Sequence, residues 1–336
     1  MKLRVILALL IFVCCFFASC AGTVDDGNLS TLSPRIAWLD GIVKIELGED
    51  SDRIVTCDAE TAGAPDGATV YTSDGYTSDG KLLGLTAADG SIYFLEREAG
   101  GGPALSRDVT IGRIDVDGTI HDLTSELFSD SEIHNELGFI RILDGKIFIS
   151  GASAYGDAYL CDPEAGNVSS RNMPATNTLD SENIYYTDGG YEIYRLTADN
   201  FEGEAEIYYD GSDFAGWEDA EYYVGVGIER LCAGGGKLYF TVSASDGYRI
   251  YSYDGELSLL HTNDLPVRQL QYYGGEVYYS DENGIWRLSD EPERICGLCA
   301  RSDESGRLQM FTCDFVIHSG RLYYDIDDFT VYKELE

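Results

Sequence analysis

Basic side chains are scarce in this chain. Its 336 residues include 23 Lys and Arg against 59 Asp and Glu, which gives a formal net charge of −36. Proteins that bind nucleic acid need clustered Lys and Arg to neutralise phosphates, so the charge argues against a nucleic-acid partner. It argues equally against docking of the folded domain on anionic lipid. The acidity is typical of an exported protein that stays soluble; a surface that collects cations or basic partners is the alternative interpretation.

The motifs of common hydrolases are also missing. The chain has four His residues, and no His-x-x-x-His pair or nucleophile-elbow sequence occurs, so neither a zinc protease nor a serine hydrolase is indicated. A glycoside hydrolase needs two carboxylates at a set separation, and the many acidic residues do not single out a pair. We therefore name no catalytic residue, no metal site and no cofactor.

Long apolar runs are absent except at the N-terminus. Lys2 and Arg4 precede the apolar segment Val5–Phe17, which is too short for an ordinary membrane span and is typical of the core of an export signal. The segment ends in Phe-Ala-Ser-Cys-Ala, and these small residues before Cys20 resemble a bacterial lipobox.

This resemblance implies that Cys20 receives lipid and becomes the first mature residue. We expect a signal peptide over residues 1–19, a flexible polar tether over 20–34 and one folded domain over 35–336. The protein would then be anchored in the cell membrane on its extracytoplasmic face. An ordinary cleaved signal with a chance cysteine is the alternative.

Six cysteines follow Cys20, and their pairing stays open. Cys296 and Cys299 have redox or metal-site spacing, but there is no second pair for zinc and no strand-to-helix context for a thioredoxin-like site. We expect buried thiols or a structural disulfide, with Cys161 and Cys232 in the core. The six are Cys57, Cys161, Cys232, Cys296, Cys299 and Cys313.

Tyrosine is abundant, at 24 residues against 3 Met, and it recurs in a repeat. Six short segments lead with a polar residue, continue with an aliphatic one and usually add one or two aromatics. Such self-similarity marks a repeat architecture, and the intervals scatter around the roughly 40–50 residues of a propeller blade. The segments are Ser91–Leu95, Lys146–Ser150, Asn183–Thr187, Lys237–Thr241, Glu276–Ser280 and Arg321–Asp325.

The repeat predicts four-stranded antiparallel blades. Consecutive apolar positions require that both sheet faces be covered, and radial stacking of blades meets that need. The segment 35–46 adds another strand pair, so we predict an all-β propeller of seven blades, with six as the alternative if residues 48–80 are an insertion. The last repeat stops after its third strand, and we expect an N-terminal strand to complete it. Residues 123–137 suit a short helix or an irregular loop.

Two repeats carry a family resemblance. Asn183–Asp188 and Glu276–Asp281, each followed by an Ile-aromatic-Arg-Leu strand, resemble the repeats of YWTD-type β-propellers of low-density-lipoprotein receptors and of bacterial surface lipoproteins. The resemblance covers roughly residues 80–336, with Tyr or Phe in place of the central Trp. It implies a propeller fold more than a function, and that family usually has six blades.

The best candidate for ligand binding is an insertion between two blades. It contains Phe214, Trp217, Tyr222 and Tyr223 beside carboxylates, and such aromatics stack on sugars or grip a protein partner; the alternative is that they pack the gap between blades. We predict a non-enzymatic binding or scaffold module for an extracellular ligand or protein. A glycan-active enzyme with its site on the propeller face, and a purely structural envelope protein, are the alternatives.

Overall fold

The structure is a computed structural model. It describes fifteen stretches of the chain, and they are almost entirely β-strand and turn. The exception of note is the short helix α2 (Leu123–Leu127), which Asp122 caps by accepting from the Ser125 N–H at 3.2 Å. The described residues are 36–39, 42–46, 51–57, 68–73, 82–97, 109–128, 137–151, 156–174, 176–214, 227–244, 247–297, 300–302, 308–310, 315–324 and 331–335.

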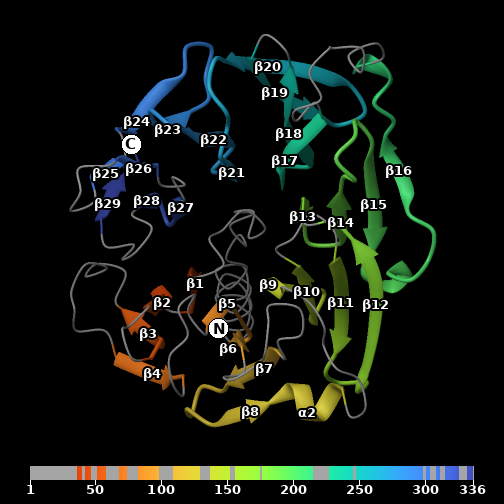
Figure 1. The fold of residues 1–336 in the computed structure, drawn as a ribbon, viewed down its shortest axis with the longest axis vertical. Helices are drawn as coiled ribbons and strands as arrows, with labels where there is room; N and C mark the ends of the chain where they lie inside the picture. The colour runs from red at the N-terminus through yellow and green to blue at the C-terminus, as the bar shows by residue number, and fades with distance from the viewer. Residues whose placement is uncertain are drawn as a thin grey trace, which may run out of the picture.

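Seven antiparallel sheets surround a common axis, and each is built from strands consecutive in sequence (Figure 1). Blade 1 contains β1 (Ile36–Trp38), β2 (Ile42–Glu46), β3 (Arg53–Cys57) and β4 (Ala68–Thr72). Blade 2 contains β5 (Leu82–Ala88), β6 (Ser91–Arg97), β7 (Val109–Ile114) and β8 (Ile120–Asp122). Blade 3 contains β9 (Leu137–Leu143), β10 (Lys146–Gly151), β11 (Gly156–Asp162) and β12 (Asn167–Met173). Blade 4 contains β13 (Asn177–Leu179), β14 (Asn183–Tyr186), β15 (Ile193–Thr197) and β16 (Glu206–Tyr209).

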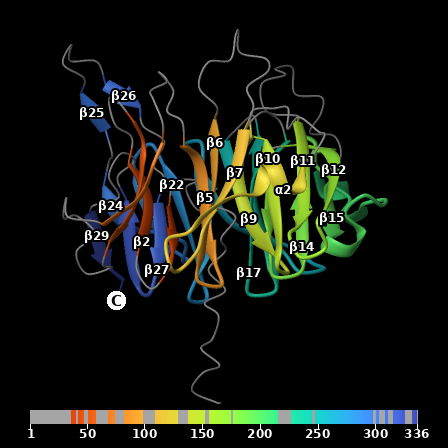
Figure 2. The same cartoon turned by 90° about the horizontal axis from the view of Figure 1, so that it is seen from below.

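Three further sheets complete the ring. Blade 5 contains β17 (Gly227–Gly234), β18 (Lys237–Ala244), β19 (Gly247–Tyr253) and β20 (Leu257–Asn263). Blade 6 contains β21 (Gln269–Tyr273), β22 (Glu276–Asp281), β23 (Gly284–Arg287) and β24 (Glu293–Gly297). Blade 7 contains β27 (Phe315–His318), β28 (Arg321–Tyr324) and β29 (Val331–Glu334). A small hairpin, β25 (Ala300–Ser302) with β26 (Leu308–Met310), precedes blade 7 and projects beyond the blades (Figure 2).

The predicted all-β propeller of seven four-stranded blades is confirmed, with three strands described in the seventh. The six-blade alternative is wrong, because residues 48–80 contain β3 and β4 of a blade and are not an insertion. The first strand of each blade lies nearest the axis and the last strand lies at the rim (Figure 1).

Tight turns join the first two strands of blades 2 and 3. In the Asp89-Gly90 turn both residues have positive φ, 50° and 79°, and Asp144-Gly145 repeats the pattern at 49° and 72°. Positive φ at both central positions is the type I′ geometry, whose twist matches that of the flanking strands, and Asp-Gly adopts it readily. Hairpin geometry therefore explains these two Asp-Gly pairs.

The core is divided into seven apolar clusters, one at each seam between neighbouring blades. The repeat tyrosines lie in these seams; Tyr278, Tyr279 and Tyr323 are no more than 2% exposed. Stacking of sheet on sheet thus covers both faces of each blade, as the doubly apolar strands predict.

Packing closes the ring between blade 7 and blade 1. Trp38 of β1 stacks on His318 of β27, with ring centroids 4.0 Å apart, and its ring lies 5.0 Å from that of Tyr323. The expected N-terminal strand is not found beside β29 among the described residues, because β1 pairs with β2 as the inner strand of blade 1. Residues 1–35, which include the expected signal and tether, lie outside the described part.

Candidate functional site at the seam between blades 4 and 5

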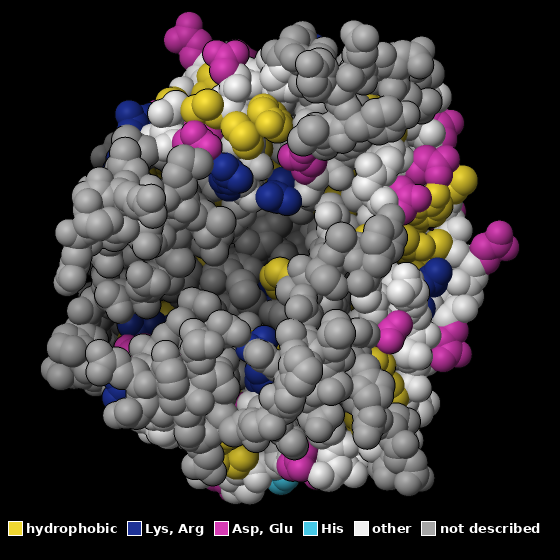
Figure 3. All heavy atoms as spheres, in the orientation of Figure 1, with side chains coloured by type: hydrophobic (Ala, Val, Ile, Leu, Met, Phe, Trp, Pro, Cys, Tyr) yellow, Lys and Arg dark blue, Asp and Glu magenta, His cyan; other side chains and the backbone are white. Residues whose placement is uncertain are grey.

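The two ends of the blades carry connections of different length. At one end, the turns between the first and second strands are two or three residues long. At the other end lie the longest connections, between β6 and β7, β8 and β9, β16 and β17, and β24 and β27. We call these ends the turn side and the loop side. Figure 3, viewed along the ring axis, shows a central hollow with several Lys and Arg side chains beside it.

The predicted binding insertion begins at the loop side of the seam between blades 4 and 5. Phe214 ends the short helix η3 (Ser212–Phe214) and is 1% exposed. Its ring packs 5.2 Å from those of Tyr191 and Tyr251 and 5.9 Å from that of Tyr209. Phe214 therefore anchors the start of the insertion in the core.

The other three predicted binding residues, Trp217, Tyr222 and Tyr223, lie outside the described residues. The structure thus does not bring the four together, and their role in binding stays a prediction.

Aromatic rings continue along this seam towards the turn side. Tyr209 lies 5.6 Å from Phe240 and 5.1 Å from Tyr253, and Tyr253 lies 5.3 Å from Tyr208. Tyr208 in turn lies 5.1 Å from Tyr185. Contacts between aromatic edges and faces contribute beyond the buried area, so this seam is stiffened along its length.

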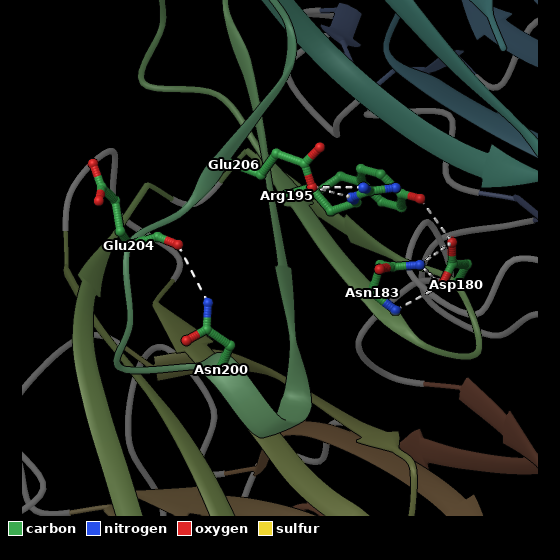
Figure 4. Close-up of polar contacts among 7 residues, drawn as sticks. Asp180, Asn183, Arg195, Asn200, Glu204 and Glu206 are labelled. Atoms are coloured by element: carbon green, nitrogen blue, oxygen red, sulfur yellow. Dashed lines mark hydrogen bonds and ion pairs between the residues drawn. The ribbon is translucent and has the colours of Figure 1, made fainter. Parts of the chain in front are cut away.

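Polar side chains cover the turn side of the same seam (Figure 4). Arg195 of β15 donates to Glu206 of β16 from Nη2 at 2.6 Å and from Nε at 3.2 Å. Asp180, in the turn before β14, accepts from the Asn183 backbone N–H at 2.7 Å and from the Tyr185 hydroxyl at 2.9 Å. Strand pairing places these groups, because Tyr185, Arg195 and Glu206 are direct neighbours across β14, β15 and β16.

The same row recurs in every second blade. Blade 2 has Tyr93, Arg113 and His121 in register across β6, β7 and β8. Blade 6 has Tyr278, Arg287 and Glu293 across β22, β23 and β24, and Arg287 bonds to Glu293. Cross-strand pairs of this kind stabilise a sheet, so a structural role accounts for the row as such. The sequence analysis did not predict this row. A signal for it is present, because an Arg follows two residues after an Ile in each of the segments 111–114, 193–196 and 285–288.

Burial and charge keep these groups in their ordinary protonation states. Burial raises the pKa of the Tyr185 phenol, and the neighbouring Asp180 carboxylate raises it further. The hydrogen bond to Glu206 raises the pKa of the Arg195 guanidinium. Both shifts keep the Tyr185 phenol neutral and the Arg195 guanidinium charged near neutral pH, so the two side chains act here as hydrogen-bond donors.

Elsewhere, one Ser, His and Asp grouping has the wrong geometry for a nucleophile. Asp115 accepts from His121 Nε2 at 2.9 Å and from the Ser91 hydroxyl at 3.2 Å. The hydroxyl therefore bonds to the carboxylate and not to the imidazole that would have to take its proton. Within the described ranges, no group of three or more His, Cys, Asp or Glu could hold a metal ion.

The described cysteines lie on strands of the blades. Cys57 and Cys161 are buried free thiols, and Cys232 is buried. Cys161 and Cys232 lie in seam clusters, as predicted. Cys296 is free and half-buried in β24. Cys299 and Cys313 lie outside the described residues. In the part of the chain that the structure covers, no helix is both long and apolar enough to cross a bilayer.

Comparisons with known proteins identify the fold. No family model matches the chain, and no curated protein sequence matches it. Among solved structures, the β-propeller domain of the Trilobed protease from Pyrococcus furiosus, described as having an open velcro topology, is 12% identical with a TM-score of 0.55; the match covers 88% of this chain and 89% of that chain. Acylaminoacyl peptidase from Pyrococcus horikoshii is 13% identical with a TM-score of 0.53, over 92% of this chain and 52% of that chain.

A propeller outside the peptidases matches as well. Saccharomyces cerevisiae Sqt1 is 12% identical with a TM-score of 0.50, over 93% of this chain and 99% of that chain. This chain spans about half the length of the peptidase, and identities this low show the fold alone. The protein is thus a seven-bladed β-propeller.

Proposed function

We propose that this protein is a lipid-anchored, extracytoplasmic propeller that binds an extracellular ligand or protein through its loop side and has no catalytic activity of its own. The observation that supports the proposal is that the repeat residues and the long connections occupy different parts of the propeller. Apolar and aromatic residues of the repeat fill the seven seams, whereas the four longest connections lie at one end of the blades. Binding residues are commonly found on loops that a rigid scaffold positions.

Two features of the sequence support the membrane anchor and the surface location in this proposal. The lipobox-like segment ending at Cys20 supports an anchor at the cell membrane, and the YWTD-like repeats support kinship with surface propellers. The Ser91, Asp115 and His121 geometry gives no support to a nucleophilic mechanism.

The anchor is tested by producing the full chain in a bacterium with a lipoprotein pathway and feeding it an alkyne-labelled fatty acid. We expect label on the wild-type protein, recovery in the membrane fraction and digestion by protease added to intact cells after removal of any outer wall. Cys20→Ala should carry no label and leave the membrane fraction. Equal labelling of the two proteins contradicts the anchor.

The loop-side role is tested with the mature protein against separated envelope glycans and envelope proteins. A triple variant, Trp217→Ala, Tyr222→Ala and Tyr223→Ala, should lose saturable binding, while its thermal unfolding stays unchanged. Turnover of any glycan by the wild-type protein would instead establish the enzyme alternative and end the proposal as stated.

A further inference from the structure

The rim strands of the propeller share a local irregularity. In four blades the pairing of the third and fourth strands skips one residue of the rim strand, which is a β-bulge. A bulge bends the strand and re-aims a side chain. The bulged residues are Val70 in β4, Tyr208 in β16, Leu260 in β20 and Ile295 in β24. Three are aliphatic, and Tyr208 alone of these four is aromatic.

Tyr208 points its ring at the turn side of the seam between blades 4 and 5. It lies at 86° to Tyr253 of β19, with centroids 5.3 Å apart. Both residues are half-buried, whereas Tyr185 beneath them is 6% exposed. Within the described residues neither the Tyr208 nor the Tyr253 hydroxyl forms a hydrogen bond to protein. The two rings are thus packed on one side and accessible to solvent on the other.

Two ion pairs frame these tyrosines. Arg195 lies 5.1 Å from the centre of the Tyr208 ring and pairs with Glu206, while Lys237 pairs with Asp254 at 2.7 Å, beside Tyr253. The side chains of Glu206, Lys237 and Asp254 are 63%, 44% and 40% exposed, so their polar atoms can be reached from solvent. All of these residues except Asp254 lie on strands, and Asp254 directly follows one, so strand pairing fixes their backbone positions.

This combination suits a sugar ring. A pyranose presents an apolar C–H face that packs on an aromatic ring, and hydroxyls that both donate and accept hydrogen bonds. Paired charges supply donors and acceptors together, without the uncompensated charge that would select an anion or a cation.

We propose that the turn side of the seam between blades 4 and 5 is a saccharide-binding site. Tyr208 and Tyr253 contact the sugar ring, and the Arg195–Glu206 and Lys237–Asp254 pairs bond its hydroxyls. The site lies at the opposite end of the blades from Phe214, where the predicted binding insertion begins, so it goes beyond the proposed loop-side function and does not depend on it.

The test is saturation-transfer difference NMR with the mature wild-type protein and four probes: cellohexaose, chitohexaose, maltohexaose and xylohexaose. We expect saturable transfer to at least one probe. Tyr208→Leu gives the bulge an aliphatic residue, as in blade 5, and should preserve the fold while weakening binding about tenfold; Tyr253→Leu should do the same.

Blade 6 offers the matched control. It has the same Tyr-Arg-acid row but Ile295 at the bulge, so Arg287→Gln should leave saccharide binding unchanged. The absence of saturable transfer to all four probes overturns the proposal. Undiminished saccharide binding by the Tyr208→Leu variant also overturns the proposal. If in addition the Trp217→Ala variant loses saccharide binding, the sugar is held at the loop side.

Discussion

Two glutamines of β21 take the place of a neighbouring strand at the seam between blades 6 and 7. Gln269 bonds to the backbone of Phe315 through both of its amide atoms, at 2.8 and 2.9 Å. Gln271 does the same with Ile317, at 3.2 and 3.1 Å. The side-chain amides thus satisfy N–H and C=O groups on the inner edge of β27, where no strand pairs with it in the described structure.

The change Gln271→Met removes this clamp with little change of volume. Gln271 is 1% exposed and Ile317 is 3% exposed, so water cannot readily replace the lost partner. Each buried backbone group left unsatisfied costs about 1–3 kcal/mol. Burial of the apolar Met side chain returns about 2 kcal/mol. Two orphaned groups cost about 2–6 kcal/mol together, so we expect the free energy of unfolding to fall by up to about 4 kcal/mol, with about 2 kcal/mol at the centre of the range.

Equilibrium unfolding in urea, followed by tyrosine and tryptophan fluorescence, measures this change, provided that unfolding is reversible. Tyr273→Phe is the matched control on the same strand, because it also removes a bond to blade 7, from the Gly320 N–H at 2.6 Å. Gly320 is half-exposed, so water can replace the hydroxyl and the loss should stay below about 1 kcal/mol. A Gln271→Met variant no less stable than Tyr273→Phe would refute the reasoning.

Three further outcomes are expected. Trp38→Ala should lower the free energy of unfolding by about 1–3 kcal/mol, because it removes the half-buried ring that joins blade 1 to His318 of blade 7. A thermal melt within 1 °C of wild type contradicts closure by packing. Iodoacetamide at pH 8, followed by mass spectrometric mapping, should modify half-buried Cys296 and spare Cys161, because burial raises the pKa of the Cys161 thiol to about 12. Fast labelling of Cys161 in the folded protein would contradict this prediction. Burial lowers the pKa of His261, and the Asp281 charge offsets this only in part. The unfolded chain therefore binds the proton more readily, so the free energy of unfolding should fall as pH drops below about 6.5. His261→Gln should flatten that part of the dependence of stability on pH, and a variant with the same pH dependence as the wild type would contradict the prediction.

The repeat was sufficient to predict the blades because it is a local property. The sequence of polar lead, aliphatic and aromatic residues recurs in the second strand of six blades, and Asp-Gly pairs specify the first hairpin of blades 2 and 3. The strand pair at 36–46 follows from the same pattern. The pattern left the six-blade alternative open, because β3 and β4 lack the anchor motif and residues 48–80 could be taken for an insertion.

The candidate site was predicted only in part. Phe214 was singled out by the insertion that contains it, but its burial depends on Tyr191, Tyr209 and Tyr251, which come from three other places in the chain. The polar cluster at the turn side was missed, because its members are far apart in sequence and meet only through strand register and a bulge at Tyr208.

The amino-acid sequence by itself determined the fold class, the number of blades to within one and the place of the tyrosines between sheets, because periodicity and turn chemistry act over a few residues. Tertiary structure alone decided how the ring closes, through Trp38 on His318 and through the glutamines of β21 on β27, since both contacts join segments that only the completed circle brings together. It also decided which aromatics keep a face in solvent, because exposure is a property of the assembled seam and not of the residue.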